Sequence, residues 1–141
     1  VASPVLGSDG IDTPTVAGLG DVVDGVVHSS AGLPSPGTPL EAFAKKFTEK
    51  TGKPFDTVYI ANGYEIGLII DAAVKAAGSL DPQALRDAVA NLKDVEGVTG
   101  KITYAGTDRM PSRDIALVEM KGGSRALVKT VAPNPADVPA P

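Results

Sequence analysis

His28, the only histidine of the chain, stands directly before Ser29 and Ser30, a grouping that could pair a base with a nucleophile. Successive residues of an extended chain point to opposite faces, so adjacency does not place the imidazole beside a serine hydroxyl. The chain also lacks a nucleophile-elbow motif. We therefore expect His28 to be a solvent-exposed residue at a strand end, and a hydrolase is a weak alternative.

Metal and nucleotide sites are also disfavoured. The chain has no Cys, which excludes thiolate catalysis and Cys-ligated zinc. Gly18-Leu19-Gly20 lacks the third glycine of a dinucleotide-binding turn, and it should end a helix instead of opening one. The aspartates near the N-terminus do not follow the spacing of a calcium-binding EF-hand loop. These are Asp9, Asp12, Asp21 and Asp24. We expect no metal and no cofactor.

Composition narrows the class of protein further. A length of 141 residues, with 43% hydrophobic and 21% charged residues, suits one ordinary domain with a soluble surface. A formal net charge of −4 disfavours a nucleic-acid partner, which would need clustered Lys and Arg. The apolar runs are far shorter than the ~20 residues that cross a bilayer. Because the sequence starts at Val1, processing or truncation is favoured over an intact start.

The first 39 residues predict short elements separated by turns. Thr13 and Pro14 have the residue types of a helix N-cap and first helical position. Gly, Pro and Ser dominate after Ser29, where no regular element should form. The expected elements are a buried strand at 4–6, a turn at 7–10, a helix at 13–19, a strand at 22–28 and a linker at 29–39.

The middle of the chain predicts three helices. Apolar residues recur at helical spacing after Leu40 and stop before Gly52, while Gly78 suits the position after a helix end. Asp81 and Pro82 have the types of a cap and first residue. The expected elements are a helix from Leu40 to Gly52, an extended segment at 55–60, a helix at 64–77 and a helix from Pro82 to about Leu92.

Short strands are expected toward the C-terminus. Glycines at Gly97 and Gly100 lead into a strand at 101–104. Strands at 114–120 and 126–131 should form a hairpin around Lys121-Gly122-Gly123-Ser124. The Pro-rich residues 132–141 should trail as an extended tail. Strands that alternate with helices indicate a mixed α/β architecture.

Three motifs in this order resemble the C-terminal part of periplasmic solute-binding proteins of the branched-chain amino acid (Leu/Ile/Val-binding) family, which have the type I fold. They are VLGSDGID at Val5 to Asp12, GYEIGLIIDAAVKAAGSLDPQALRDAV at Gly63 to Val89, and GVTGKITY at Gly97 to Tyr104. The resemblance spans roughly Val5 to Val131.

The resemblance implies an α/β fold that is present only in part. Members of this family are much longer and have two α/β lobes that close over a small solute. By this resemblance, residues 1–32 are a second-lobe segment with a crossing, 33–110 a first-lobe segment, 111–131 a second-lobe hairpin, and 132–141 the Pro-rich tail. Association of the fragment with another copy or with the missing part is expected, since sheet edges and apolar helix faces would be uncovered.

The resemblance also implies site residues. Asp9 occupies the acidic position of the family's G-x-[DE]-G turn, whose carboxylate pairs with the ligand ammonium. Tyr59, Asn62 and Tyr64 fall where family members present side chains to the cleft. Other interpretations stay open: Asp9 could bond its own turn, the tyrosines could be core residues, and Asn62 could cap a helix.

The implied function is that of a receptor for an ABC importer of branched-chain or related amino acids or small organic solutes, and not an enzyme. Its partners would be the solute and a membrane ABC permease, in the periplasm or another extracytoplasmic space. A ligand-sensing regulatory domain with the same fold is the alternative.

Overall fold

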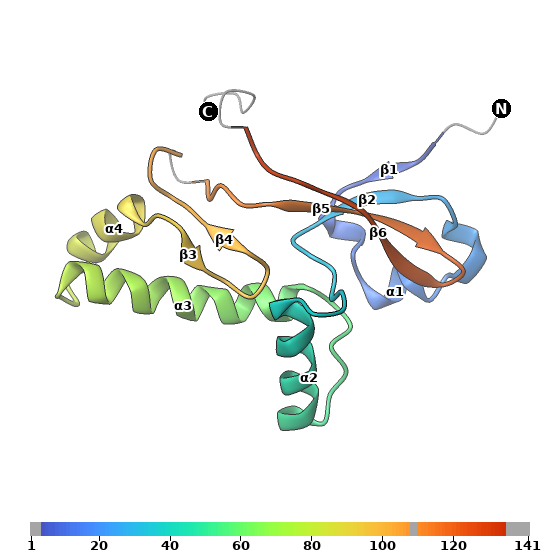
Figure 1. The fold of residues 1–141 in the computed structure, drawn as a ribbon, viewed down its shortest axis with the longest axis horizontal. Helices are drawn as coiled ribbons and strands as arrows, with labels where there is room; N and C mark the ends of the chain where they lie inside the picture. The colour runs from blue at the N-terminus through green and yellow to red at the C-terminus, as the bar shows by residue number, and fades with distance from the viewer. Residues whose placement is uncertain (1–3, 108–109, 135–141) are drawn as a thin grey trace.

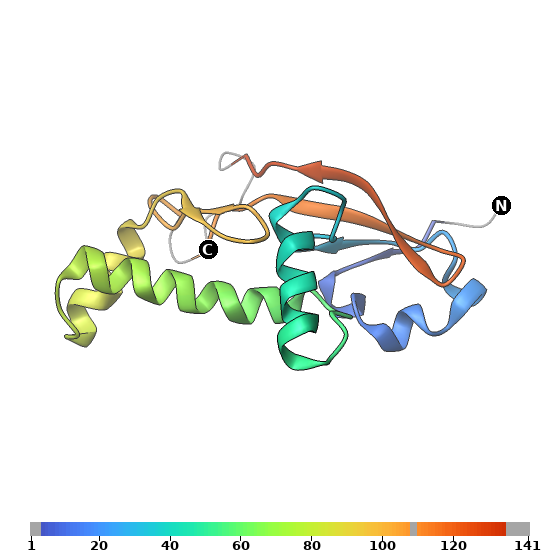
Figure 2. The same cartoon turned by 60° about the horizontal axis from the view of Figure 1, so that its bottom comes forward.

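The computed structural model describes residues 4–107 and 110–134, which form two modules side by side (Figures 1 and 2). The sheet module comprises residues 4–30 and 115–131, and the helix module comprises residues 39–102. Residues 31–38 form the first crossing segment between them, and residues 103–107 and 110–114 belong to the second. The architecture is mixed α/β, as predicted.

A four-stranded sheet with the order β1-β2-β5-β6 is the centre of the sheet module. The chain enters it through β1 (Leu6–Gly7) and β2 (Val27–Ser30), which are parallel. It returns after the helix module through β5 (Ile115–Lys121), antiparallel to β2, and β6 (Ser124–Val131), antiparallel to β5. The first and last segments of the chain therefore share one sheet.

The hairpin β5–β6 matches the prediction closely. Gly122 and Gly123 form its turn with φ angles of 56° and 70°, a backbone region that favours glycine. Along β5 the buried residues alternate, because successive side chains point to opposite faces of the sheet. These buried residues are Ala116, Val118 and Met120.

Two predictions for the N-terminal segment are wrong. The expected strand at 22–28 begins only at Val27, because residues Gly20–Val23 form the 3-10 helix η2. His28 is 1% exposed instead of solvent-exposed, since β1 and β5 flank β2 on both sides. Its Nδ1 donates to the carbonyl of Ser29 at 3.0 Å, and the structure gives its Nε2 no partner among the described residues.

One prediction for this segment holds and one is corrected. Thr13 caps α1 (Pro14–Ala17) by accepting a hydrogen bond from the amide of Val16 at 3.3 Å. The strand expected to be buried at 4–6 is instead exposed at Val5 (59%) and Leu6 (77%), because β1 is an edge strand of the sheet.

Three helices form the helix module, and proline and glycine delimit two of them as expected. Helix α2 (Pro39–Thr51) is capped by Thr38 and ends at Gly52, which has a φ of 68°. Helix α4 (Pro82–Asn91) is capped by the carboxylate of Asp81, which accepts from two backbone amides at 3.0 Å. Figure 1 shows α4 folded back along the far end of the long helix α3.

Helix α3 (Tyr59–Ala77) starts five residues earlier than the predicted start at Tyr64. Its N-cap, Val58, has no side chain that can accept a hydrogen bond, so the usual start signal is absent. Val58 is instead buried with Leu40 and Ala61 in a small core. Tertiary packing therefore extends the helix back to Tyr59, across the last two residues of the predicted extended segment at 55–60.

A short hairpin of β3 (Val95–Glu96) and β4 (Lys101–Ile102) lies beside α3. The buried carboxylate of Glu65 holds its turn by accepting from the amide and the hydroxyl of Thr99, at 2.8 and 2.7 Å. Arg113 of the second crossing segment pairs with the same carboxylate at 3.2 Å. Glu65 thus joins the helix, the hairpin and the crossing segment.

The predicted tail at 132–141 lies mostly outside the described residues, which end at Asn134. The predicted strand at 101–104 is shorter than expected and ends at Ile102, after which Thr103 forms an isolated bridge with Ser112.

Candidate functional site

The candidate site lies at the module interface, where residues 9–12 of the sheet module meet residues 56–59 of the helix module. Both segments are short connections placed by regular structure. Residues 9–11 are the 3-10 helix η1, which directly follows β1, and residues 56–58 lead into α3. Side chains from parts of the chain that are distant in sequence can therefore converge on one solute between two modules.

Asp9 and Tyr59, two of the residues predicted from sequence, are brought together here. The hydroxyl of Tyr59 donates to the backbone carbonyl of Asp9 at 2.7 Å, across 50 sequence positions. The carboxylate of Asp9 is exposed, and it accepts no hydrogen bond from the described residues. It is therefore available to a cation.

The electrostatic environment of Tyr59 supports this grouping. Loss of solvation, followed by the negative charges of Asp9 and Asp12, raises the pKa of Tyr59 above its ordinary value. The two carboxylates are therefore close enough to the phenol to oppose its ionisation. A tyrosine that stays neutral keeps its hydroxyl as a donor.

Asp12 is a residue whose importance the sequence did not reveal. It is 1% exposed. Its carboxylate accepts a hydrogen bond from the hydroxyl of Ser30 at 2.5 Å and forms an ion pair with Arg125 of β6. Its backbone carbonyl accepts from the hydroxyl of Thr57 in the helix module at 3.3 Å. Burial of a carboxylate requires such partners, because an unpaired charge would be costly.

Arg125 also crosses the module interface. One guanidinium nitrogen pairs with Asp12, and the other donates to the backbone carbonyl of Asp56 at 3.0 Å. Its side chain is 20% exposed. Because Arg125 and Asp12 are 113 positions apart, no local pattern could have predicted this pair.

The side chains of Asn62 and Tyr64 form no hydrogen bond or ring contact with residues 9–12 or 56–59 of the described chain. Asn62 is the fourth residue of α3 and not a helix cap, and its buried carboxamide oxygen has no partner among the described residues. The ring of Tyr64 packs against Phe43 of α2, with centroids 4.9 Å apart. Tyr64 is nevertheless 49% exposed, so it packs on the surface of α2 and α3 and is not a core residue. Solute contact by either residue stays a prediction.

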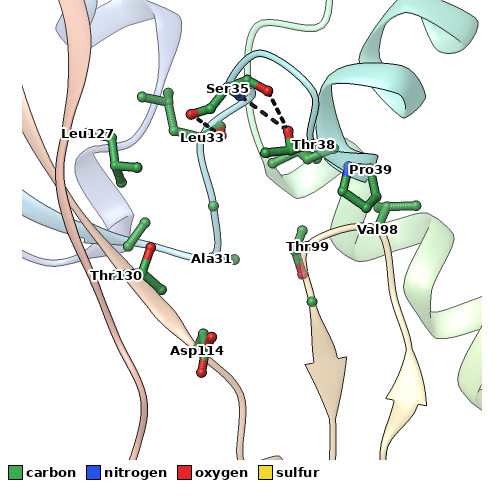
Figure 3. Close-up of a pocket in the computed structure, with 14 residues that line it drawn as sticks. Ala31, Leu33, Ser35, Thr38, Pro39, Val98, Thr99, Asp114, Leu127 and Thr130 are labelled. Atoms are coloured by element: carbon green, nitrogen blue, oxygen red, sulfur yellow. Dashed lines mark hydrogen bonds between the residues drawn. The ribbon is translucent and has the colours of Figure 1, made fainter.

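A cavity of about 230 Å³ lies beside the first crossing segment, between the two modules (Figure 3). Its walls come from this segment, the start of α2, the turn before β4, and strands β5 and β6. The labelled lining includes Ala31, Leu33, Val98, Asp114 and Leu127. None of the four predicted site residues lines it, so it is separate from the place where Asp9 meets Tyr59.

Residues 4–107 and 110–134 contain neither a candidate metal cluster nor a candidate membrane-spanning helix. No cluster of three or more His, Asp or Glu side chains in this part of the chain could hold a metal ion. No helix there combines the length and apolar character needed to cross a membrane.

Two α/β modules joined by crossing segments, with polar groups facing one another between them, define part of a two-lobed binding protein of the type I fold. The chain belongs to the periplasmic binding protein family, because the model of that family matches residues 3–125. The resemblance stated from sequence is thereby confirmed. No match was found among curated proteins.

Solved structures support the same fold. The leucine-binding protein LivK of Thermotoga maritima is 22% identical, with a TM-score of 0.78 over 91% of this chain and 37% of its own. A putative branched-chain amino acid ABC transporter protein of Rhodospirillum rubrum is 27% identical, with a TM-score of 0.73 over 91% and 38%. A solute-binding protein of R. palustris, solved with benzoate, is 24% identical, with a TM-score of 0.72 over 92% and 36%.

These matches show that the chain spans little more than a third of the solved proteins that it resembles. The described fold is accordingly a partial type I fold.

Proposed function

We propose that this chain is part of the solute-binding receptor of an ABC importer for branched-chain or related amino acids or small organic solutes. The observation that carries the proposal is the convergence of Asp9 and Tyr59 at the module interface. Family membership supplies the context, since the matching model describes periplasmic binding proteins.

In this proposal, the carboxylate of Asp9 binds an ammonium group of the solute. A carboxylate at a partly desolvated interface forms short, charge-assisted hydrogen bonds, which are about twice as strong as neutral ones. Tyr59 lies beside Asp9, with its hydroxyl fixed by the bond to the Asp9 carbonyl. Its aromatic ring would contact the side chain of the solute and select for its shape.

The range of solutes is wider than amino acids among similar proteins. The protein of R. palustris was solved with benzoate, which has a carboxylate but no ammonium, whereas the T. maritima protein is described as binding leucine. Comparing the binding of solutes with and without an ammonium group therefore distinguishes the contribution of Asp9 from that of the other site residues.

The two modules would belong to different lobes. The sheet module and its crossing would be parts of the second lobe (1–32 and 111–131), and the helix module would be part of the first (33–110). Closure of the lobes over the solute would then be the signal that a membrane permease reads, in the periplasm or another extracytoplasmic space. Asn62 and Tyr64 remain proposed contributors from the first lobe.

Exposed apolar surface supports the proposal that further structure covers this chain. Leu6 on the edge strand is 77% exposed, and Ile66 and Ile70 on α3 are 58% and 55% exposed. Residues of this kind on an edge strand and a helix face favour association with the rest of a longer protein or with a second copy. Sedimentation of the isolated chain would distinguish self-association from a monomer.

Calorimetry on the full-length protein tests the function directly. We expect saturable binding of at least one solute from a panel of aliphatic amino acids, aromatic amino acids and aromatic carboxylates. Absence of binding across the panel would contradict the proposal. A sensor domain of the same fold would bind equally well, so the gene neighbours, a permease and ATPase or a signalling module, distinguish these two roles.

A further inference from the structure

We propose that Arg125 is a positioning residue for solute binding, because it holds residues 56–59 against the loop that carries Asp9. This inference rests on the proposed function for its consequence, but its geometric basis does not involve a solute. Arg125 would act through its neighbours and would not touch the solute itself.

Arg125 is itself held in place by the sheet module. Asp12 anchors one side of the guanidinium and is fixed in turn by the hydroxyl of Ser30 on β2. Asp12 and Ser30 are each 1% exposed, so this anchor is shielded from water and from competing ions. The guanidinium therefore has a defined direction within the sheet module.

Arg125 also forms a hydrogen bond with the helix module. The planar guanidinium has nitrogens that diverge, so it can serve two acceptors at once. Here the second acceptor is the backbone carbonyl of Asp56, at 3.0 Å. A backbone acceptor belongs to the chain path itself, so this bond constrains the position of the segment and not only that of one side chain.

Two hydroxyl groups lie close to Asp56 in sequence. Thr57 directly follows Asp56 and Tyr59 is three positions after it, and both donate to backbone carbonyls of residues 9–12, at 3.3 Å to Asp12 and 2.7 Å to Asp9. Of these three bonds across the module interface, that of Arg125 is the one made by a charged donor. We expect the two hydroxyl bonds to depend on it, because charge-assisted bonds are the stronger kind.

The consequence concerns the relative position of the modules. With Arg125 in place, Tyr59 stands beside Asp9 before any solute arrives. Without Arg125, the two crossing segments would be the main remaining restraint between the modules. The distance between modules should then lengthen or spread, and the site would be less well preorganised.

Distance measurement between two spin labels tests this in the 141-residue chain without any solute. The chain has no Cys, so labels can be attached at Val22→Cys and Lys46→Cys, which are exposed positions in the sheet and helix modules. We expect one narrow distance distribution for the parent chain. Arg125→Gln should shift its mean to a longer distance or broaden it.

Two further variants test whether the effect is specific to the guanidinium group of Arg125. Arg125→Lys keeps the charge beside Asp12 but loses the planar fork, so we expect a distribution between those of the parent and Arg125→Gln. Arg86→Gln is the matched control, because Arg86 of α4 is exposed and its side chain forms no bond to the described residues. It should leave the distribution unchanged.

A destabilised variant is handled by a second substitution. Arg125→Gln leaves a buried carboxylate unpaired, whereas Asp12→Asn with Arg125→Gln removes both charges and still removes the bond to Asp56. Circular dichroism identifies which variants are folded. A folded variant of either kind whose distance distribution coincides with that of the parent would overturn the proposal. That result would leave solute binding by Asp9 untouched.

Discussion

The carboxylate of Glu65 in α3 accepts two hydrogen bonds from Thr99, at 2.8 Å from its amide and 2.7 Å from its hydroxyl, although the residues lie 34 positions apart. Gly97 makes this approach possible. A Cβ atom at Gly97 would lie 2.5 Å from Glu65 Oε1 and 2.9 Å from the carbonyl oxygen of Gly100. The β3–β4 turn therefore packs closely on the buried carboxylate of Glu65, and there is no room for a side chain at position 97.

Gly97→Ala should destabilise the chain, because either Glu65 or the turn must move to admit the methyl group. Overpacking of this kind costs about 1–3 kcal/mol. Chemical denaturation of the 141-residue chain measures the change. Gly63→Ala is the control, since a Cβ atom at Gly63 in α3 meets no atom within 4 Å. It should be neutral or stabilising by up to about 1 kcal/mol. Equal effects of both substitutions on stability would contradict the close packing of Gly97 against Glu65.

Glu65→Gln should also lower the free energy of unfolding. It leaves Arg113 without its ionic partner while keeping the shape of the side chain. Breaking one side of a buried pair costs about 3–5 kcal/mol, and we expect the lower end because Arg113 is 18% exposed. Glu49→Gln, at an exposed position of α2, should change stability by less than about 0.5 kcal/mol. Calorimetric melting of both variants would show the difference.

Asp9→Asn should weaken binding of an amino acid to the full-length protein by about tenfold to a hundredfold, equivalent to ~1.5–3 kcal/mol for a charge-assisted hydrogen bond. Binding of a carboxylate without an ammonium should change little. Titration calorimetry measures both. Asp21→Asn is the matched control, because Asp21 is exposed in η2. Unchanged amino-acid affinity in Asp9→Asn would remove Asp9 from the site.

Tyr59→Phe deletes one hydroxyl and with it the bond to the carbonyl of Asp9. We expect solute affinity to fall by about threefold to tenfold, since the net value of such a bond is about 0.5–1.5 kcal/mol. Tyr64→Phe keeps the ring contact with Phe43 and should preserve stability. A loss of affinity in Tyr64→Phe would instead place its hydroxyl at the solute.

The ionisation of Tyr59 should follow from its surroundings. Its pKa is raised above the ordinary value of about 10, first by lost solvation and then by Asp9 and Asp12. The folded state thus holds the phenolic proton more tightly than the unfolded state. The resulting stabilisation is complete below pH ~10 and is lost as pH rises through the folded pKa.

Absorbance titration of tyrosinate measures this pKa in a chain that carries Tyr64→Phe and Tyr104→Phe, where Tyr59 is the remaining tyrosine. Addition of Asp9→Asn removes one of the two charges and should bring the pKa part of the way back toward 10. A titration at or below the ordinary value in the parent would contradict the described environment.

Sequence predicted those elements whose ends have a local chemical cause. Asp81 and Pro82 start α4, Gly52 and Gly78 follow helix ends in the left-handed region, and Gly122-Gly123 turns the hairpin. Each signal depends on a residue and its immediate neighbours, so a pattern along the chain is sufficient.

The errors arose where distant contacts decide. Val58 opens α3 without a capping side chain because it packs with Leu40, and His28 is buried because β5 arrives from residues 115–121. The candidate site divides in the same way. Family resemblance pointed to both Asp9 and Tyr59, whereas the pairing of Asp12 with Arg125 became visible only in three dimensions.

The interleaved path of the sheet module has a consequence for how the protein is made. Val27 pairs with Glu119, so the central strand contact must wait until residue 119 has been synthesised, 92 positions later. The helix module has all its segments earlier, between residues 39 and 102, and can assemble first. We therefore expect synthesis to produce a folded middle section while the N-terminal strands are still unpartnered and most open to misassociation.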